Sequence, residues 1–292
     1  MTSRASHRRR RPGSSDRHVA DSFPQGKGTI RGLLASHGLR PNPSYGQNFL
    51  TDPNVIHRIV DLADLGPESS VVEIGGGTGT LTGVLAATGA RVVVYEIDAG
   101  LVRVLEETVG DLPNVDIRHA DATNVDLGRD LGEGTWSLVA NLPYNVGTGI
   151  VLDALRYTPS IDRFVILVQR EVADRLLAPA GSRTYGIPSV VAAIHATGSI
   201  AFTVPPSVFY PTPAVESAVV DLRRHAAPDG AERAIEIATV AFGQRRKMLR
   251  GSLSGVIADP TVVLERSGVD PTARPEDLTS GDFVSIAREL EA

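Results

Sequence analysis

The stretch "SVVEIGGGTGTLT", residues 70–82, runs from an apolar segment through three consecutive glycines into a segment with helical spacing. An apolar run of this length, ended by glycine, predicts a buried β-strand. Gly75 and Gly77 allow the backbone to turn sharply and to approach a ligand without a clashing Cβ. Thr80 replaces the third glycine of the pattern G-x-G-x-x-G, so the turn departs from the dinucleotide-binding fingerprint.

The strand–helix alternation continues along the chain. Further apolar segments predict strands at 91–98, 115–121, 137–141 and 163–169, and helices are predicted at 53–65, 80–89, 100–110 and 171–178. Asp52 and Pro53 form the N-cap and first position of the helix at 53–65. Two late β-rich runs follow at 199–205 and 217–223. The order predicts an α/β, Rossmann-like domain whose parallel sheet is covered on both faces.

The composition changes at both ends of this α/β region. Residues 1–24 are rich in Arg, Ser and Gly and predict a disordered basic tail, residues 25–224 form the Rossmann-like domain, and residues 225–292 predict a smaller, all-helical domain. Residues 1–48 hold nine Lys and Arg against two Asp and Glu, whereas residues 49–222 hold ten against twenty-one. A uniformly cationic nucleic-acid coat is therefore excluded, but local basic contacts to phosphate are compatible with this pattern.

Several classes of protein are excluded by the composition. The chain has no cysteine, which rules out disulfides and thiolate chemistry. It has no apolar run long enough for a membrane span, and no apolar segment follows the basic start as it would in a secretory signal. The seven histidines show no metal-ligand spacing, so no metal site is predicted. We expect a monomeric, cytoplasmic protein.

Acidic residues follow the second and third strands of the predicted sheet. Glu96 ends the second strand about 20 residues beyond the glycine turn, where a carboxylate accepts both ribose hydroxyls of a nucleoside. Asp121 closes the third strand and is placed to accept from an adenine amine. These residues predict an adenosyl-binding site and leave two cofactors open, NAD and S-adenosylmethionine. Glu73, just before the glycines, could orient the loop or meet the methionine end of the cofactor.

The segment Asn141-Leu142-Pro143-Tyr144 ends the fourth strand beside the predicted cofactor cleft. Asn141 offers a carbonyl acceptor, and Pro143 restricts Leu142 to an extended conformation that can aim its carbonyl into the cleft. Tyr144 supplies a flat ring. Two acceptors and a ring suit the exocyclic amine of adenine, whose lone pair could then attack a sulfonium methyl group. Alternatively, Asn141 caps a turn and Tyr144 packs in the core.

Taken together in chain order, these segments resemble the rRNA adenine N6-methyltransferases, which comprise the KsgA and Erm enzymes. The resemblance extends from about residue 40 to the end of the chain. The matching segments are "GQNFLTD" (46–52), "VVEIGGGTGTLT" (71–82), "VYEID" (94–98), "DAT" (121–123), "NLPYN" (141–145), "VQREVADRL" (168–176), "YGIPSV" (185–190), "FTVPPSVFYPTPAVESAVV" (202–220) and "AFGQRRKMLRGSL" (241–253). The C-terminal segment and "FYPTPAVESAVV" resemble the KsgA branch.

The resemblance implies an activity and a role for each matched residue. A KsgA-type enzyme dimethylates two adjacent adenosines in the 3'-terminal hairpin loop of 16S rRNA, in the immature 30S subunit, with S-adenosylmethionine as cofactor. The residues implied to bind the cofactor are Asn48, Leu50, Gly75, Gly77, Glu96, Asp121 and Asn141. Asn141, Leu142, Pro143 and Tyr144 would be catalytic, and Phe209 would stack on the flipped base opposite Tyr144.

Three positions depart from the family pattern. Gly76 stands where proline is frequent, Ala214 where a lysine is common, and Gly251 where asparagine is usual. Arg245, Arg246, Lys247 and Arg250 lie on a predicted helix, where Arg246 and Arg250 share a face. We interpret these four as RNA-binding residues that contact phosphate; alternatively, they form a solvated face or internal ion pairs.

Three other functions stay open at this point. The first is methylation of 23S rRNA by an Erm-like enzyme that confers macrolide resistance. The second is a mainly non-catalytic factor in 30S assembly. The third is an NAD-dependent oxidoreductase, against which Thr80 and the segment 141–144 argue.

Overall fold

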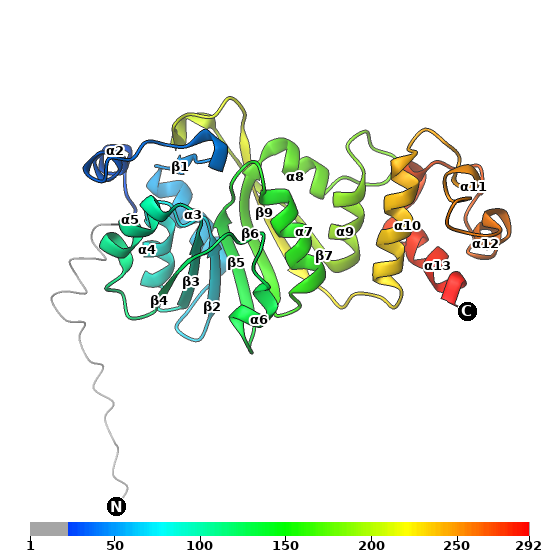
Figure 1. The fold of residues 1–292 in the computed structure, drawn as a ribbon, viewed down its shortest axis with the longest axis horizontal. Helices are drawn as coiled ribbons and strands as arrows, with labels where there is room; N and C mark the ends of the chain where they lie inside the picture. The colour runs from blue at the N-terminus through cyan, green and yellow to red at the C-terminus, as the bar shows by residue number, and fades with distance from the viewer. Residues whose placement is uncertain (1–22, 292) are drawn as a thin grey trace, which may run out of the picture.

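A central sheet organises the chain in the computed structural model, which describes residues 23–291 (Figure 1). Most of the tail predicted at 1–24 lies outside the described residues. Within them the main sheet has seven strands in the spatial order β4-β3-β2-β5-β6-β9-β7. Their bounds are β2 (Ser70–Ile74), β3 (Arg91–Glu96), β4 (Val115–His119), β5 (Trp136–Asn141), β6 (Ile161–Gln169), β7 (Ala196–Val204) and β9 (Ser217–Arg224).

The first five strands in the spatial order are parallel, and β9 runs antiparallel to both β6 and β7. Helices cover both faces: α3 (Pro53–Ala63), α4 (Thr80–Ala87), α5 (Ala99–Val109), α6 (Leu127–Leu131), α7 (Gly147–Tyr157) and α8 (Arg170–Leu176). Val71 and Val72 are neighbours in β2 and pack in different hydrophobic cores. Val71 packs with α3 and α4, whereas Val72 packs with α7. This two-sided burial explains why the strands are almost continuously apolar. The Rossmann-like prediction is confirmed.

The predicted start of α3 is also found in the structure. The carboxylate of Asp52 accepts hydrogen bonds from the backbone N–H groups of Asn54 and Val55, and Pro53 occupies the first turn. The cap satisfies two N–H groups that the helix itself leaves unpaired.

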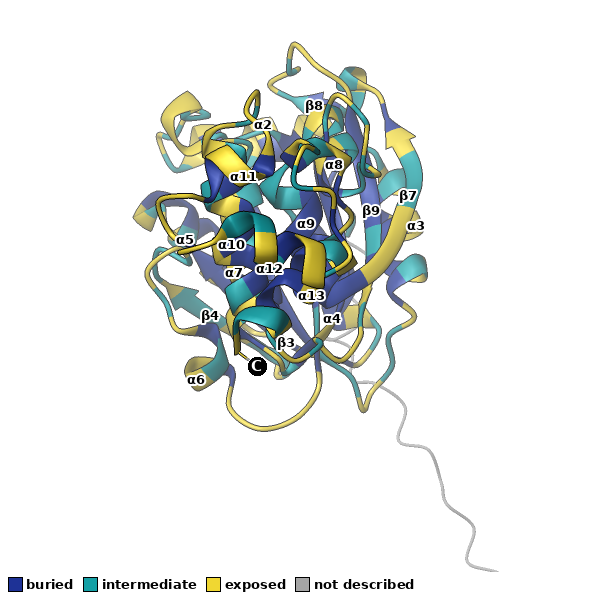
Figure 2. Ribbon diagram, turned by 90° about the vertical axis from the view of Figure 1, so that its right-hand side faces the viewer, coloured by how far each residue is buried: buried dark blue, intermediate teal, exposed yellow. Residues whose placement is uncertain are grey.

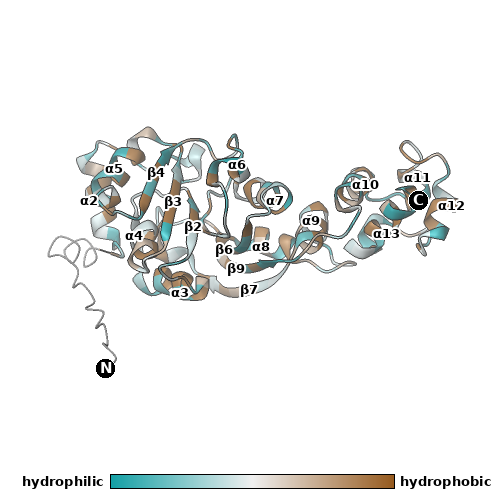
Figure 3. Ribbon diagram, turned by 90° about the horizontal axis from the view of Figure 1, so that it is seen from below, coloured by the Kyte–Doolittle hydropathy of each residue, from teal (hydrophilic) through white to brown (hydrophobic). Residues whose placement is uncertain are grey.

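A second, helical core follows the sheet. It contains α10 (Ala231–Gly243), α11 (Leu249–Ser252), α12 (Pro260–Arg266) and α13 (Ser280–Glu291), together with α9 (Ile187–His195). No element was predicted at the position of α9, because its short apolar run does not distinguish a strand from a helix. Most residues of α9 are buried, and the helix lies between the sheet and the C-terminal helices (Figures 2 and 3). This helix precedes the predicted boundary at 224–225 but shares its core with the C-terminal helices.

The prediction that Arg245, Arg246, Lys247 and Arg250 lie on one helix is wrong, because α10 ends at Gly243. Residues 244–247 form a turn, and α11 starts only at Leu249. The backbone N–H groups of Leu249 and Arg250 donate to the carbonyls of Ala273 and Pro271, at 2.8 and 3.1 Å. These hydrogen bonds to residues 271–273 prevent α10 and α11 from forming one continuous helix.

A short antiparallel pair joins two segments that are distant in the sequence. In it β1 (Phe49–Leu50) pairs with β8 (Phe209–Tyr210), with Phe49 opposite Tyr210 and Leu50 opposite Phe209. The helix α2 (Lys27–Ser36) packs beside this pair (Figure 1). None of the helices within residues 23–291 has the length and apolar character needed to cross a membrane.

Candidate functional site

The glycine turn after β2 forms one wall of a pocket. Gly75, Gly77 and Gly79 have φ values of +80°, +60° and +83°, a left-handed conformation that favours glycine. The turn is held from the next strand, since the N–H of Gly75 donates to the carbonyl of Tyr95 at 2.8 Å. The ring of Phe49 lies so close to Gly77 that an added Cβ would approach it to 3.2 Å.

Gly76 is tightly packed against two side chains. A Cβ at this position would lie 2.4 Å from Cγ2 of Val94 and 3.1 Å from Cδ1 of Leu105. Both partners are fully buried, so neither can move aside freely. A proline at this position would meet the same two side chains.

We therefore expect Gly76→Ala to destabilise the protein by about 1–3 kcal/mol, the usual result of overpacking a core. The measurement is the free energy of unfolding in urea. Gly149→Ala is the control, because an added Cβ at Gly149 in α7 has nothing within 4 Å, and removing a helical glycine should stabilise by up to about 1 kcal/mol. Equal stability of Gly76→Ala and the unchanged protein would contradict the packing argument.

The pocket brings together side chains from segments that lie far apart in the sequence. All predicted cofactor and catalytic positions line it, namely Asn48, Leu50, Gly75, Gly77, Glu96, Asp121, Asn141, Leu142, Pro143 and Tyr144. The carboxyl ends of β2, β3, β4 and β5 meet here, as expected for a ligand site of an open parallel sheet.

Two acidic side chains present oxygens to this pocket. Glu96 is almost fully buried, and its carboxylate accepts from the N–H groups of Gly77 and Asp98, at 2.9 and 3.0 Å. Burial raises the pKa of Glu96, whereas the N–H donors oppose the rise by stabilising the carboxylate. Asp121 accepts from the N–H and hydroxyl of Thr123 at 2.9 and 2.7 Å, which fixes its orientation. Both carboxylates keep lone pairs for ligand hydroxyls or amines.

Glu73 is a third carboxyl group that lines the pocket. It is only 2% exposed, and its Oε2 atom has no hydrogen-bond partner. Burial raises its pKa from 4.5 to about 8, and the nearby charge of Glu96 adds to the rise. At neutral pH the group is therefore mainly protonated in the protein alone.

Asn141 is held by one end of its amide. Its Nδ2 donates to the backbone carbonyl of Asn48 at 2.8 Å, which ties the end of β5 to the loop before β1. Its Oδ1 is buried and has no partner among the described residues. A buried acceptor without a hydrogen-bond partner costs free energy. An unpaired Oδ1 in a pocket therefore indicates a position where a hydrogen-bond donor of a ligand fits.

Tyr144 is fixed by a residue that the sequence analysis missed. Its hydroxyl lies 2.7 Å from Oγ of Ser217, which is fully buried in β9. Burial raises the pKa of Tyr144, so the phenol stays neutral and can share a proton with the serine. Ser217 follows the segment "FYPTPAVE", but nothing in its local pattern indicated a contact 73 residues away.

The loop at 43–48 lines the pocket with residues 45–48, and Tyr45 among them was not predicted. The side-chain amide of Asn145 donates to the carbonyl of Ser44 at 2.9 Å, which joins this loop to the segment after β5. Tyr45 is 39% exposed and lines the pocket. A partly exposed aromatic residue that lines a pocket is available to a flat ligand.

The prediction that Phe209 faces the base is wrong in this structure. Phe209 is fully buried and packs in the core with Leu50, its partner across the β1–β8 pair. It is not among the residues that line the pocket. The short strand pair, which the sequence did not reveal, directs this ring into the core.

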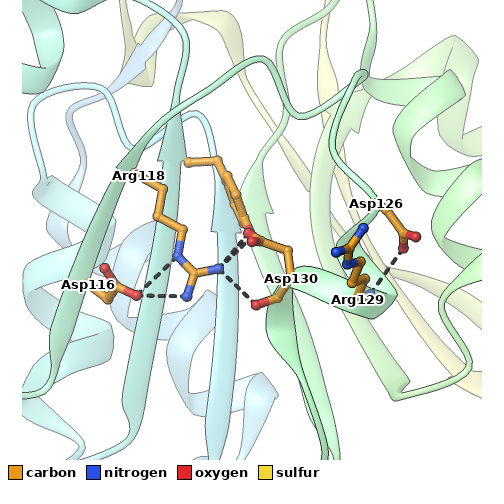
Figure 4. A network of polar contacts seen from close by, with 6 residues as sticks. Asp116, Arg118, Asp126, Arg129 and Asp130 are labelled. Carbon is orange, nitrogen blue, oxygen red and sulfur yellow. Dashed lines mark hydrogen bonds and ion pairs between the residues drawn. The ribbon is translucent and has the colours of Figure 1, made fainter.

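Tyr95 supports the pocket from behind. Tyr95 lines the pocket, and its hydroxyl donates to Asp130 in α6. Arg118 bridges Asp130 and Asp116, with N–O distances of 2.6 and 2.8 Å (Figure 4). This network joins β3, β4 and α6, and so fixes both ends of the segment that carries Asp121.

The four basic residues near 245–250 differ in their surroundings. Arg245 pairs with Glu276 at 2.5 Å and donates to the carbonyl of Arg183. Arg246, Lys247 and Arg250 are exposed, and no ion pair within residues 23–291 includes them. The expected common face of Arg246 and Arg250 is wrong because a turn separates them. No cluster of His, Asp or Glu suited to a metal ion occurs in the described part of the chain.

Comparisons with known proteins agree with this geometry. A family model described as "Ribosomal RNA adenine dimethylase" matches residues 38–292. A Kineococcus radiotolerans protein named "Ribosomal RNA small subunit methyltransferase A" is 43% identical over 266 residues, covering 88% of this chain and 89% of its own. A protein of the same name from Leifsonia xyli is 41% identical over 274 residues, covering 90% and 97%.

Two solved structures are also similar. The 23S rRNA methyltransferase ErmE is 26% identical with a TM-score of 0.65, covering 84% of this chain and all of its own. A dimethyladenosine transferase from Plasmodium falciparum is 21% identical with a TM-score of 0.71, covering 83% and 97%, which shows a shared fold.

Proposed function

The chain belongs to the ribosomal RNA adenine dimethylase family, and we propose that it dimethylates the N6 amines of two adjacent adenosines in the 3'-terminal hairpin loop of 16S rRNA. The observation that carries the chemistry is the unpaired, buried Oδ1 of Asn141 in the same pocket as Glu96 and Asp121. The small-subunit target is supported by the names of the similar proteins, and the Erm-like alternative is not favoured.

The pocket fits S-adenosylmethionine as the methyl donor. Glu96 accepts the ribose hydroxyls and Asp121 the adenine amine, while Gly75 and Gly77 leave room for the methionine part. Asn48, just before β1, and Leu50, in β1, border the cofactor. When bound, this cofactor supplies a methyl group on a positively charged sulfonium. The carboxylates of Glu96 and Asp121, which line the pocket, suit that charge.

The segment 141–144 orients the acceptor amine. Oδ1 of Asn141 accepts one N–H of the adenine N6 group, and the Leu142 carbonyl accepts the other. Pro143 holds that carbonyl in place, and Tyr144, fixed by Ser217, stacks on the base. Hydrogen bonds to both N–H groups localise the nitrogen lone pair toward the methyl donor, so positioning replaces a strong base.

Incubation with labelled S-adenosylmethionine and unmethylated 30S particles tests the function. We expect N6,N6-dimethyladenosine at two adjacent positions of 16S rRNA and none in 23S rRNA. Label in 23S rRNA would favour the Erm-like alternative. Binding to the particle without any label would instead favour an assembly factor.

Among the basic residues near 245–250, Arg246 and Arg245 should respond differently to substitution. Arg246→Ala should weaken binding of the 30S particle about threefold to tenfold, with S-adenosylmethionine affinity unchanged, because an exposed cation contacts phosphate. Arg245→Ala removes the ion pair with Glu276 and should mainly lower the melting temperature. Separate titrations and thermal melts measure these effects. Equal RNA binding by Arg246→Ala and the unchanged protein would contradict the assignment.

A further inference from the structure

The helix α2 is unassigned by the family comparison, since it ends at Ser36 and the matched residues begin at 38. We propose that α2 is a phosphate-binding element that contacts the RNA strand flanking the adenosine in the pocket. This inference rests on the proposed function. It adds an RNA contact at the end of the molecule opposite the C-terminal helices (Figures 1 and 3).

The apolar face of α2 packs directly on the wall of the pocket. Ile30 and Leu34 are buried with Phe49 and Leu101, and the last two line the pocket. The end of the helix is held by a contact of 3.1 Å between Nε2 of His37 and the carboxylate of Glu107. Whatever the exposed face of α2 binds is therefore held next to the pocket.

The exposed face of α2 carries two cations over one aromatic ring. Nζ of Lys27 and Cζ of Arg31 lie 5.9 and 5.8 Å from the centre of the Tyr210 ring. The two residues are one helical turn apart and exposed, and no ion pair within residues 23–291 includes either. Tyr210 restrains both side chains, so less conformational entropy is lost when a phosphate binds between them.

The position of Tyr210 links these cations to the site. In the β1–β8 pair it lies opposite Phe49, which covers Gly77 in the glycine turn. The loop at 43–48, which includes the pocket-lining Tyr45, leads directly into β1, the strand that contains Phe49. A base in the pocket would thus leave its flanking backbone within reach of this face.

The charge distribution favours RNA as the ligand of the exposed face of α2. Residues 23–48 hold three Lys and Arg and no Asp or Glu, whereas residues 49–222 hold ten basic against twenty-one acidic residues. A polyanion that approaches the acidic domain is repelled except where cations are concentrated. An acidic protein would also be attracted to α2, but the adjoining pocket is built to take a base.

The test compares Lys27→Ala/Arg31→Ala with the unchanged full chain in titrations with the 30S particle over a range of salt concentrations. We expect binding to weaken about tenfold at moderate salt, and the slope of log K against log salt to fall by about two. S-adenosylmethionine affinity and melting temperature should stay the same. Residues 1–22 are present in both proteins, so their charges do not affect the comparison.

Arg58→Ala is the matched control. Arg58 is exposed on α3 and lies 3.8 Å from the centre of the Phe202 ring, but no residue of α3 lines the pocket. Arg58→Ala should leave the salt slope of 30S binding unchanged. The single substitution Arg31→Lys, which keeps both positive charges, should retain most of the binding.

Methylation of 16S rRNA by the unchanged chain is measured in parallel. This measurement separates the proposed RNA contact of α2 from the proposed methyltransferase activity. An unchanged salt slope in a chain that still methylates 16S rRNA would overturn the role of α2 alone. Weaker binding of S-adenosylmethionine with unchanged RNA binding would also overturn it, since α2 would then only support the pocket wall. A reduced slope in a chain that methylates no RNA would leave the α2 contact standing and reject the proposed activity.

Discussion

Asn141→Ala is expected to reduce methyl transfer to 16S rRNA by about 100-fold to 1000-fold, the usual effect of removing one well-placed hydrogen-bonding group from a reacting centre. The variant loses Oδ1, which is buried and unpaired in the protein alone, and with it the acceptor for the adenine amine. Single-turnover methylation of unmethylated 30S particles at saturating S-adenosylmethionine measures the loss.

Asn145→Ala separates this effect from loosening of the loop. Asn141 and Asn145 each donate an amide hydrogen bond to a carbonyl of the loop at 43–48, at 2.8 and 2.9 Å. Asn145 is exposed, so its substitution removes a loop contact without removing a buried acceptor. We expect a loss of about threefold or less for Asn145→Ala. Similar losses in both variants, or full turnover by Asn141→Ala, would show that amine orientation does not depend on Oδ1.

The sequence was sufficient to predict those parts of the site that depend on strand ends. Apart from Asn48 and Leu50, each predicted cofactor residue ends a strand of the parallel sheet or lies just after one. The register of a parallel sheet brings such positions to one edge. Glu96 and Asp121 are examples, because β3 and β4 pair directly and end together. The α/β fold was predictable for the same reason, since continuous apolar strands alternate with amphipathic helices.

Features that depend on pairing between distant segments were not predictable. Phe209 is buried because two residues of β1 pair with β8 across 160 residues of sequence, and no local pattern encodes such a short pair. The contact between Tyr144 and Ser217 has the same origin. The break after Gly243 arises from backbone bonds to residues 271–273, which override the helical propensity of the segment.

Glu73→Gln should change the pH dependence of stability more than any other single substitution in the pocket. In the folded protein burial raises the pKa of Glu73 to about 8, against 4.5 for the free side chain. Below pH 4.5 both the folded and the unfolded states bind the proton. Between pH 4.5 and 8 the folded state keeps the proton and the unfolded state releases it, so stability falls as pH rises, by about 1.4 kcal/mol per pH unit.

Glutamine keeps the shape and stays neutral, so the variant lacks this contribution. The free energy of unfolding of Glu73→Gln should exceed that of the unchanged protein by an amount that grows from near zero at pH 4.5 to as much as about 5 kcal/mol at pH 8. Urea unfolding at several pH values measures this difference. Glu68→Gln removes the same charge from an exposed position and should stay within about 0.5 kcal/mol of the unchanged protein. Parallel stability curves for Glu73→Gln and the unchanged protein would mean that Glu73 is ionised in the fold, and the pocket would then hold two buried carboxylates before any cation binds.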